Sequence, residues 1–323
     1  MCIRDRSNGG TLNFVNALEN FGRMEGDSTI DSNVTILNAG TIAPGNSIGT
    51  LTLGNDTQFT GESVLEIELG STTGSAGVDW DQLVVSGTLD LSAANLLTIK
   101  LTSLDSNGDP GLLSGFDANT SVSWRIADCN DITGFSTGVI AIDSFEFQNS
   151  IEGIFIVAQS GDQLFLNYLS DADQTNSNSF STVRGILRNG DLNSVLDSDD
   201  QTLEYNPGFT LNSNEPPVWV EFESSVSGSP DWLNVRIESR ANTINILQTV
   251  EMFNWTTNSF EEITALPTSF NVDAANTISV PMPSRFIQAG TGNVKSRVGW
   301  RQDGFILLFP WTVNIDQVIW LTQ

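Results

Sequence analysis

Short alternations of apolar and polar residues, separated by Gly, Asn and Pro, constrain this chain more than any other feature. They are clearest over Gly40–Leu53 (GTIAPGNSIGTLTL) and Trp80–Leu91 (WDQLVVSGTLDL). A period of two places alternate side chains on opposite faces of a strand, and Gly or Asn between the runs supplies the turns. The pattern predicts many short strands, each with one face toward a core and the other toward water. It says little about chemical activity.

The first six residues, Met1–Arg6, are set apart from the rest of the sequence. Their codons, read back as ATG TGT ATA AGA GAC AGN, match the mosaic end of a transposon used for sequencing libraries, so we interpret them as a sequencing-adaptor artefact. We therefore expect a fragment whose natural N-terminus is missing, in which an export signal would not be visible.

The chain is strongly acidic. It has 13 Lys and Arg against 39 Asp and Glu, no His, and a net charge of −26. Without Met1–Arg6 the balance is 11 − 38 = −27. This charge excludes nucleic acid as a partner, because Lys and Arg must neutralise the phosphates, whereas it would attract divalent cations. No run approaches ~18 apolar residues, so we expect no membrane span.

Side chains for nucleophilic catalysis are scarce. Serine triads and cysteine dyads use a base that His usually supplies, and His is absent from the sequence. Cys2 lies in the adaptor segment, so Cys129 stands alone and is predicted to be a small buried residue. Glu66 and Glu68, in LEIEL, share one strand face and resemble the carboxylate pair of a glycosidase. Solvated strands carry such pairs as well, and we expect no enzyme.

The basic residues divide the chain in two. Outside the adaptor segment only three precede position 173, and eight follow it. Between the halves, Asp171–Ser179 (DADQTNSNS) has one apolar residue and is expected to contribute nothing to a core. We predict one domain over residues 7–170, a linker over 171–180 and a second domain over 181–323.

The first half carries strand signals at short intervals, with Gly, Asn or Asp at most of the breaks. Helical periodicity is nearly absent. A stacked coil with repeats of ~20–25 residues, each burying its inner face on the next, accounts for the pattern. An ordinary antiparallel sandwich is the alternative, and strand content alone does not exclude it.

A resemblance adds to this interpretation. The segment Asn38–Leu91 contains P-G-N-S-I-G-T-L followed by D-x-L-x-V-x-G, and it is similar to the C-terminal end of bacterial autotransporter-type passenger regions. Gly153–Tyr168 looks like the closing hairpin of the same regions. The resemblance implies a right-handed parallel β-helix with a C-terminal cap. It implies little about activity, because such helices carry adhesins, lyases and inert stalks alike.

The second half has its own series of alternating strands. Seven or more of them, with Pro-containing loops, suggest a β-sandwich of jelly-roll type. The segments Arg285–Trp300 and Pro310–Trp320 are similar to a terminal domain of large secreted or surface proteins of environmental bacteria, for which no activity is established. They also resemble carbohydrate-binding jelly rolls, whose last strand often carries I-D-x-V, here at residues 315–318.

Six of the eight tryptophans lie in this second half. Flat aromatic faces stack on sugar rings, so exposed Trp side chains on a sandwich would make a glycan-binding platform. Trp219, Trp300 and Trp320 occupy strand positions typical of a core. Trp232 and Trp255 stand in turn contexts and are the candidate sugar-binding tryptophans.

Two charged groups of the second half are also candidates for binding. Arg297 and Arg301 are four apart in an apparent strand and so share a face, where they would contact an anionic glycan or pair with carboxylates. Asp197, Asp199 and Asp200 form an acidic cluster that is either a cation site or a solvated turn, and we favour the turn.

A calcium loop is suggested in the first half. Asp105, Asn107 and Asp109, in DSNGDPG, place side-chain oxygens at alternate positions, as the first half of a calcium loop does. Pro110 stands where that loop has Gly, and Phe116 where it has its closing Glu. A plain loop is therefore the competing interpretation.

Together these features predict a non-enzymatic, extracellular or cell-surface bacterial protein, an all-β chain in which a β-helix is followed by a sandwich. The helix would be a rigid spacer, with a structural or adhesin-like role, and calcium is the one cofactor that the sequence suggests. The alternative is a glycan-binding module in the sandwich, and a third reading is a polysaccharide-active enzyme on the helix. The expected partner is an extracellular glycan or another surface protein.

Overall fold

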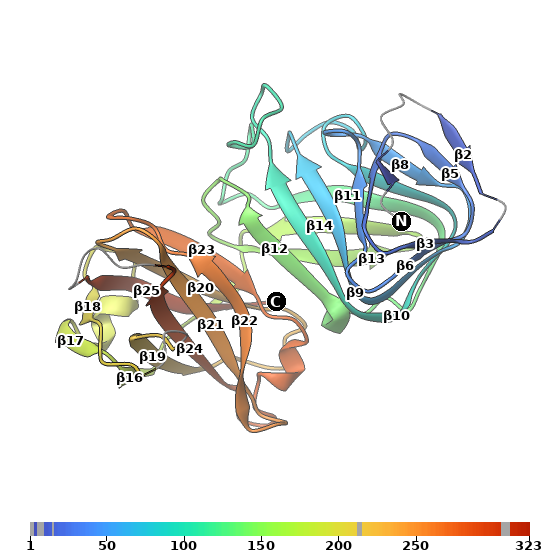
Figure 1. Ribbon diagram of the computed structural model, residues 1–323. Helices are drawn as coiled ribbons and strands as arrows, with labels where there is room; N and C mark the ends of the chain where they lie inside the picture. The colour runs from blue at the N-terminus through green and yellow to red at the C-terminus, as the bar shows by residue number, and fades with distance from the viewer. Residues whose placement is uncertain (1–2, 5–9, 15, 212–214, 305–310) are drawn as a thin grey trace. The chain divides into compact units, whose positions relative to one another are not determined.

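The computed structural model describes residues 3–4, 10–14, 16–211, 215–304 and 311–323 (Figure 1). Most of the adaptor segment at 1–6 lies outside the described residues. The chain forms two compact units, 1–171 and 172–323. The described regular structure is β apart from 3-10 turns, and no helix in these ranges is long and apolar enough to cross a membrane. The 3-10 turns are η1 (Thr137–Val139), η2 (Leu192–Val195) and η3 (Pro283–Arg285).

The first unit contains one 14-stranded sheet. Its strands are β1 (Ile3–Arg4), β2 (Thr11–Asn13), β3 (Leu18–Asn20), β4 (Arg23–Gly26), β5 (Thr29–Asp31), β6 (Val34–Ile36), β7 (Thr41–Pro44), β8 (Thr50–Leu53), β9 (Thr57–Leu69), β10 (Gln82–Ser103), β11 (Val122–Thr133), β12 (Ile140–Glu146), β13 (Ile154–Ser160) and β14 (Gln163–Leu169).

These strands pair in three parallel ladders, which appear in Figure 1 as strands stacked one beyond another. The ladders run β1–β4–β7–β9–β10–β12, β2–β5–β8–β10–β11 and β3–β6–β9–β10–β11. In the first ladder Arg23 pairs with Thr41, Thr41 with Val64, Val64 with Thr98 and Thr98 with Ala141. The chain therefore returns to each ladder after every circuit.

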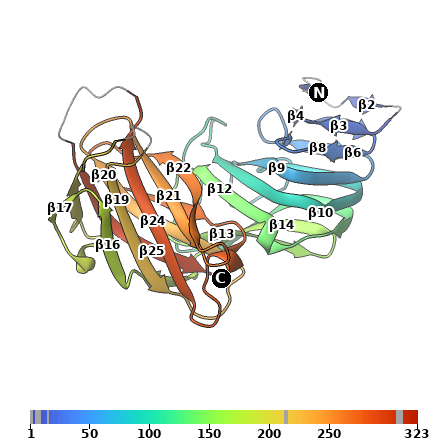
Figure 2. The ribbon, with the colours of Figure 1, turned by 60° about the horizontal axis from the view of Figure 1, so that its bottom comes forward.

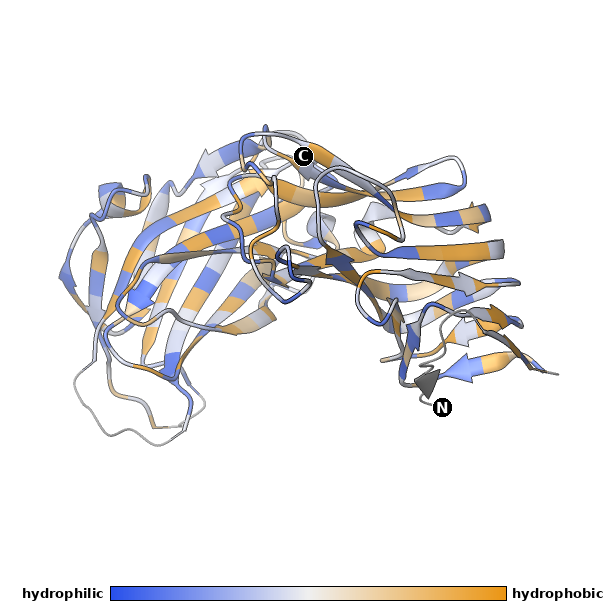
Figure 3. Cartoon of the chain, turned by 90° about the horizontal axis from the view of Figure 1, so that it is seen from above, coloured by the Kyte–Doolittle hydropathy of each residue, from blue (hydrophilic) through white to orange (hydrophobic). Residues whose placement is uncertain are grey.

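Inward side chains stack along each ladder and form the core of the first unit. Met24, Ile42, Leu65, Ile99 and Ile142 are successive partners in one row, and all are buried. Along strands such as β8 and β10 inward apolar residues alternate with polar ones. The hydropathy colouring of Figure 3 shows such alternation along strands. The predicted alternation is thus confirmed, and the parallel pairing excludes the antiparallel sandwich as an account of these strands.

The last strands of the first unit pair differently. β14 is antiparallel to both β11 and β13, so the hairpin predicted over Gly153–Tyr168 is present. The buried Tyr168 hydroxyl donates to Ala118 O at 2.8 Å and accepts from Gly153 N at 2.8 Å, which ties the hairpin to neighbouring loops. Cys129 is buried as predicted, and burial, helped by Asp128, raises the pKa of its thiol to about 12.

The second unit contains two antiparallel sheets, of order β17–β18–β25–β20–β23 with β15 also on β25, and β16–β19–β24–β21–β22 (Figure 2). The strands are β15 (Asp173–Asn176), β16 (Ser179–Arg184), β17 (Ile186–Asn189), β18 (Leu203–Asn206), β19 (Val218–Ser225), β20 (Leu233–Ala241), β21 (Ile246–Asn254), β22 (Ser259–Pro267), β23 (Ala274–Ser279), β24 (Asn293–Gln302) and β25 (Val313–Thr322).

Side chains from both sheets meet in one hydrophobic core, so this unit is a β-sandwich. Val220 and Val298 come from one sheet, and Val235 and Trp320 from the other. Trp300 is also fully buried in this core. The core positions predicted for Trp300 and Trp320 are confirmed.

The predicted linker over residues 171–180 is wrong. β15 lies in this range and pairs with the end of β25, Asp173 opposite Thr322, and β16 begins at Ser179. Ser177 Oγ also donates to Val318 O at 2.7 Å. A strand at this position is held by backbone hydrogen bonds, which need no apolar side chain, so the polar composition concealed it.

Candidate functional site

The sheet β16–β19–β24–β21–β22 has a polar and aromatic outer face. Along β19, Val218, Val220 and Phe222 point into the core, which places Trp219 and Glu221 on the opposite face. The alternation continues on the neighbouring strands β24, β21 and β22. We call the following set on this face the aromatic–arginine strip: Arg184, Trp219, Arg297, Phe260, Phe253 and Trp255.

Rings and guanidinium groups stack along the strip. The Arg297 guanidinium carbon lies 3.7 Å from the Phe260 ring centroid and 5.0 Å from that of Trp219. Arg184 lies on β16, the other neighbour of β19, and its guanidinium carbon is 5.6 Å from the Trp219 ring centroid. Cation–π contacts of this kind are favourable within ~6 Å of a ring centroid. Arg297 thus joins the two rings across the sheet.

The far end of the strip is a cluster of aromatic rings. Phe253 and Phe260 are cross-strand partners with centroids 5.1 Å apart in an edge-to-face arrangement. Trp255 meets Phe253 edge to face at 4.9 Å, and its Nε1 donates to Phe286 O at 3.1 Å. These contacts hold the three half-buried rings in fixed orientations.

Glycine gives the Trp219 indole its place on the sheet. Gly299 is the partner of Trp219 on β24. A Cβ at Gly299 would lie 2.6 Å from Pro216 Cγ and 3.1 Å from Trp219 Cδ1. A side chain at position 299 would therefore collide with Pro216 and crowd the Trp219 indole.

Carboxylates surround the cations of this face. Arg297 Nη2 and Nε lie 2.8 and 3.1 Å from Glu221 Oε2, and Nη1 lies 3.8 Å from Glu251 Oε2. Lys295 Nζ contacts Glu223 Oε1 at 2.5 Å and Glu221 Oε1 at 3.5 Å. Burial raises the pKa of Glu251 although Arg297 opposes it. Burial alone would lower the pKa of Lys295, but the hydrogen bonds and charges of Glu223 and Glu221 together outweigh burial and raise that pKa.

The structure brings only part of the predicted site together. Arg297 and Trp255 belong to the strip. Trp232 is 5% exposed, and its N–H and C=O bond to Gln323, which prolongs the β20–β25 pairing by one residue. The prediction of Trp232 as a sugar-binding platform is therefore wrong, because its indole lies in the interior.

Trp219 is a second tryptophan that sequence reasoning misplaced. It is half-buried on the outer face and not in the core. The signal was present in β19, because Val218, Val220 and Phe222 already fill the inward positions. Size alone makes Trp a typical core residue, but the period of the strand decides its face.

Arg301 lies on the same strand and face as Arg297 but lines a separate pocket of about 630 Å³. The other lining residues include Phe209, Leu211, Gln302 and Trp311. Arg301 is thus not part of the strip, although its predicted side of β24 is confirmed.

The suggested calcium loop is closed on itself. The Asp105 carboxylate accepts hydrogen bonds from the backbone of Asn107 at 2.8 Å and of Asp109 at 3.2 Å. These bonds lower the pKa of Asp105. In the part of the chain that the structure describes, no group of three or more acidic, Cys or His side chains is placed to hold a metal ion. The arrangement favours the plain loop.

The second acidic cluster forms a turn, as predicted. Asp199 accepts from Gln201 N at 3.1 Å and from its side-chain amide at 2.6 Å. Asp200 has φ 65°, which is typical of a tight turn, and lies 4.0 Å from Arg240. The Asp199 carboxylate oxygens therefore accept hydrogen bonds within the turn.

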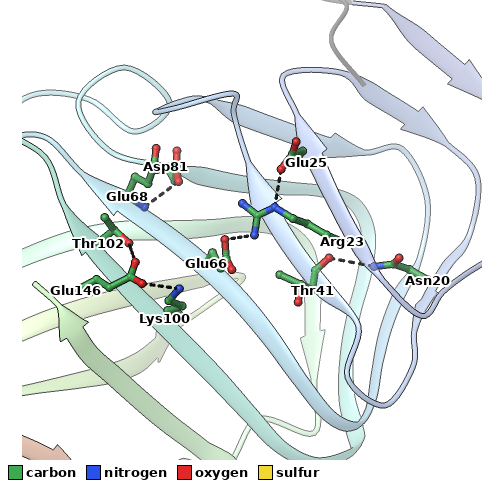
Figure 4. A network of polar contacts seen from close by, with 10 residues as sticks. All are labelled: Asn20, Arg23, Glu25, Thr41, Glu66, Glu68, Asp81, Lys100, Thr102 and Glu146. Atoms are coloured by element: carbon green, nitrogen blue, oxygen red, sulfur yellow. Dashed lines mark hydrogen bonds and ion pairs between the residues drawn. The ribbon is translucent and has the colours of Figure 1, made fainter. Parts of the chain in front are cut away.

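The outer face of the first unit carries a network of charges around Glu66 and Glu68 (Figure 4). Arg23 forms ion pairs with Glu25 and Glu66, while Lys100 Nζ lies 3.1 Å from Glu146 Oε1. The predicted shared face of Glu66 and Glu68 is confirmed. Both line a hollow of about 250 Å³.

Asp81 also lines this hollow and supports the backbone. Its buried carboxylate accepts from Gly49 N at 2.9 Å and Glu68 N at 2.8 Å. Burial raises the pKa of Asp81 well above its usual range and also raises that of Glu68, against a hydrogen bond from Ser47. The bonds of Asp81 connect a corner of the chain to β9, which is a structural role.

Comparison with known proteins gives structural likenesses of low similarity. No protein-family model matches the chain, and no curated protein matches it. Among solved structures, the CBM36-1 domain of a multidomain xylanase from the hindgut metagenome of Trinervitermes trinervoides is 13% identical, with a TM-score of 0.30, 47% of this chain and 98% of that chain being covered. A CBM36 module in complex with calcium and xylotriose is 7% identical, with a TM-score of 0.28 and coverages of 46% and 97%. TmCBM61 in complex with β-1,4-galactotriose is 10% identical, with a TM-score of 0.27 and coverages of 48% and 90%. TM-scores this low carry no conclusion about function.

Proposed function

We propose that the protein is a non-catalytic, extracellular surface protein whose second unit binds a glycan on the aromatic–arginine strip. The observation that carries this proposal is the continuous row of contacts among Trp219, Arg297, Phe260 and Phe253 on an otherwise polar sheet face. Ordered rings with an apolar face and a polar rim suit sugar rings, which present C–H groups on their faces and hydroxyls at their edges.

The first unit would serve as a spacer. We propose that it is the C-terminal end of a right-handed parallel β-helix, as in the autotransporter-type passenger regions that its sequence resembles. Three parallel ladders with stacked inward side chains support this proposal. The antiparallel pairing of β11, β14 and β13 supports a role as a cap, because it covers strand edges that would otherwise pair with other chains. For the second unit, two packed antiparallel sheets support the jelly-roll type.

Glycan binding is tested on the whole chain by affinity electrophoresis in gels that contain a panel of soluble polysaccharides. At least one polysaccharide should retard the protein. Trp219→Ala and Phe260→Ala should each weaken that retardation about ten-fold, which corresponds to ~1.4 kcal/mol of stacking.

Phe270→Ala is the matched control, because Phe270 is 50% exposed on the loop after β22 and lies outside the strip. The affinity of this variant for the polysaccharide should equal that of the unmodified protein. Loss of binding in the control but not in Trp219→Ala would move the site away from the strip, and no retardation by any polysaccharide would refute glycan binding.

A further inference from the structure

We propose that the aromatic–arginine strip selects an uncharged glycan, and that Arg297 is a positioning residue that holds the rings in place and not a cation that attracts acidic sugars. This inference rests on the proposed function and specifies its ligand class. It reverses the simplest interpretation of a surface arginine in a sugar-binding face, namely recognition of a carboxylate or sulfate.

The polar edge of Arg297 is already occupied. Its Nε and Nη2 donate to Glu221, and its Nη1 faces Glu251. The flat faces of the guanidinium remain for contact with Phe260 and Trp219. A planar cation that is held by carboxylates at its edge and by rings at its faces acts as a stacking element, which a Lys ammonium would not reproduce.

The two other cations next to the strip residues, Lys295 and Arg184, also contact carboxylates. Lys295 contacts Glu221 and Glu223, and Arg184 Nη2 lies 2.8 Å from Glu215 Oε2 while its Nη1 donates to Pro216 O at 3.0 Å. Four carboxylates (Glu215, Glu221, Glu223, Glu251) therefore match three cations (Arg184, Lys295, Arg297), and 3 − 4 leaves a charge of −1. The chain as a whole carries −26. An acidic glycan would meet net repulsion here.

The strip crosses the strands of the sheet. Arg184, Trp219, Arg297, Phe253 and Phe260 come from β16, β19, β24, β21 and β22, which are successive neighbours. Four inter-strand steps of about 4.8 Å give a length of roughly 19 Å. This length fits an extended run of several sugar rings, so the ligand class is a neutral polysaccharide whose rings stack by their C–H faces.

The test compares pairs of polysaccharides that share a backbone and differ only in charge, such as hydroxyethyl and carboxymethyl forms of one β-glucan, and mannan or galactan with their C6-oxidised forms. The full chain is measured by affinity electrophoresis at low and high salt. The neutral member of at least one pair should bind at least ten-fold more tightly at low salt, and added salt should narrow the difference.

Tighter binding of the carboxylated member would overturn the inference while leaving glycan binding intact. Failure of every polymer, neutral or charged, would overturn the proposed function together with the inference.

Two variants test the role of Arg297. Glu221→Gln removes a carboxylate from its edge, so affinity for the carboxylated polymer should rise at least three-fold while neutral binding persists. Arg297→Gln should weaken binding of the neutral polymer about three- to ten-fold. Arg297→Lys, which keeps the charge but not the planar group, should weaken it as well. If Arg297→Gln lost affinity only for the carboxylated polymer, Arg297 would be a cation that binds anionic sugars, and the inference would be contradicted. Thermal unfolding of each variant separates these effects from loss of the fold.

Discussion

At the scale of single residues, Asp316 on β25 is the least expected side chain of the second unit. It is 2% exposed, and its Oδ1 has no hydrogen-bond partner among the described residues. Burial and the nearby negative charge of Glu238, with smaller contributions from Asp199 and Asp200, raise its pKa to about 6. A carboxyl group in this setting favours its neutral form at acidic pH.

We expect Asp316→Asn to stabilise the protein more at pH 8 than at pH 5. The folded pKa of about 6 lies above the unfolded value, so the folded state binds the proton more tightly. The stability that this group contributes is therefore fully present only below the unfolded value of about 4 and is lost as the pH rises from there through about 6. Asparagine keeps a neutral side chain throughout.

Thermal unfolding at pH 5 and pH 8 measures this difference. Asp231→Asn, at an exposed site away from the acidic residues around Asp316, is the control and should shift the melting temperature at neither pH. Equal shifts of Asp316→Asn at both pH values would contradict the assignment of the proton to Asp316.

At the scale of elements, one carboxylate connects separate circuits of the first unit. Asp81 precedes β10, yet it accepts hydrogen bonds from Gly49, just before β8, and from Glu68 on β9. The neighbouring Trp80 donates its Nε1 to Arg125 O on β11 at 3.0 Å. The two residues thus hold four strands in register through side-chain contacts to the backbone.

Asp81→Ala should lower the free energy of unfolding by about 2–4 kcal/mol, because it leaves two buried N–H groups without an acceptor. Urea denaturation followed by circular dichroism measures this loss. Asp109→Ala, on an exposed loop of the same unit, provides the comparison and should stay within about 0.5 kcal/mol of the unmodified protein. A loss for Asp81→Ala no larger than that would show that water replaces the carboxylate.

At the scale of the whole molecule, charge is the dominant property. A balance of −26 with no histidine gives a negative potential that does not switch sign near neutral pH. Several of the few cationic side chains are neutralised in ion pairs such as Arg297–Glu221. Little positive surface remains to meet a polyanion.

We therefore expect no retention of the protein on heparin or on double-stranded DNA at low salt, where electrostatic attraction is strongest. A column run at 50 mM salt is a sufficient measurement. A lysine- and arginine-rich DNA-binding protein of similar size, loaded with it, serves as the positive control. Retention would contradict the view that the negative charge of the chain outweighs its few cations.

Much of the architecture could be predicted from local patterns. The alternation in Thr50–Leu53 and Gln82–Ser103 identifies strands, and the absence of helical periodicity excludes helical layers. Part of the candidate site was predicted too, since Arg297 and Trp255 belong to the strip. Phe253 and Phe260 could not be named in advance, because their pairing across β21 and β22 exists only after the hairpin forms.

The sequence by itself determined the charge, the strand period and the burial of Cys129, because these depend on residue type and on neighbours along the chain. The tertiary structure alone decided that Trp232 is covered, that Trp219 lies on an outer face and that residues 173–176 are a strand. A period of two divides side chains between two faces, but it does not say what covers each face. That depends on backbone pairing between segments far apart in the chain, which local composition does not encode.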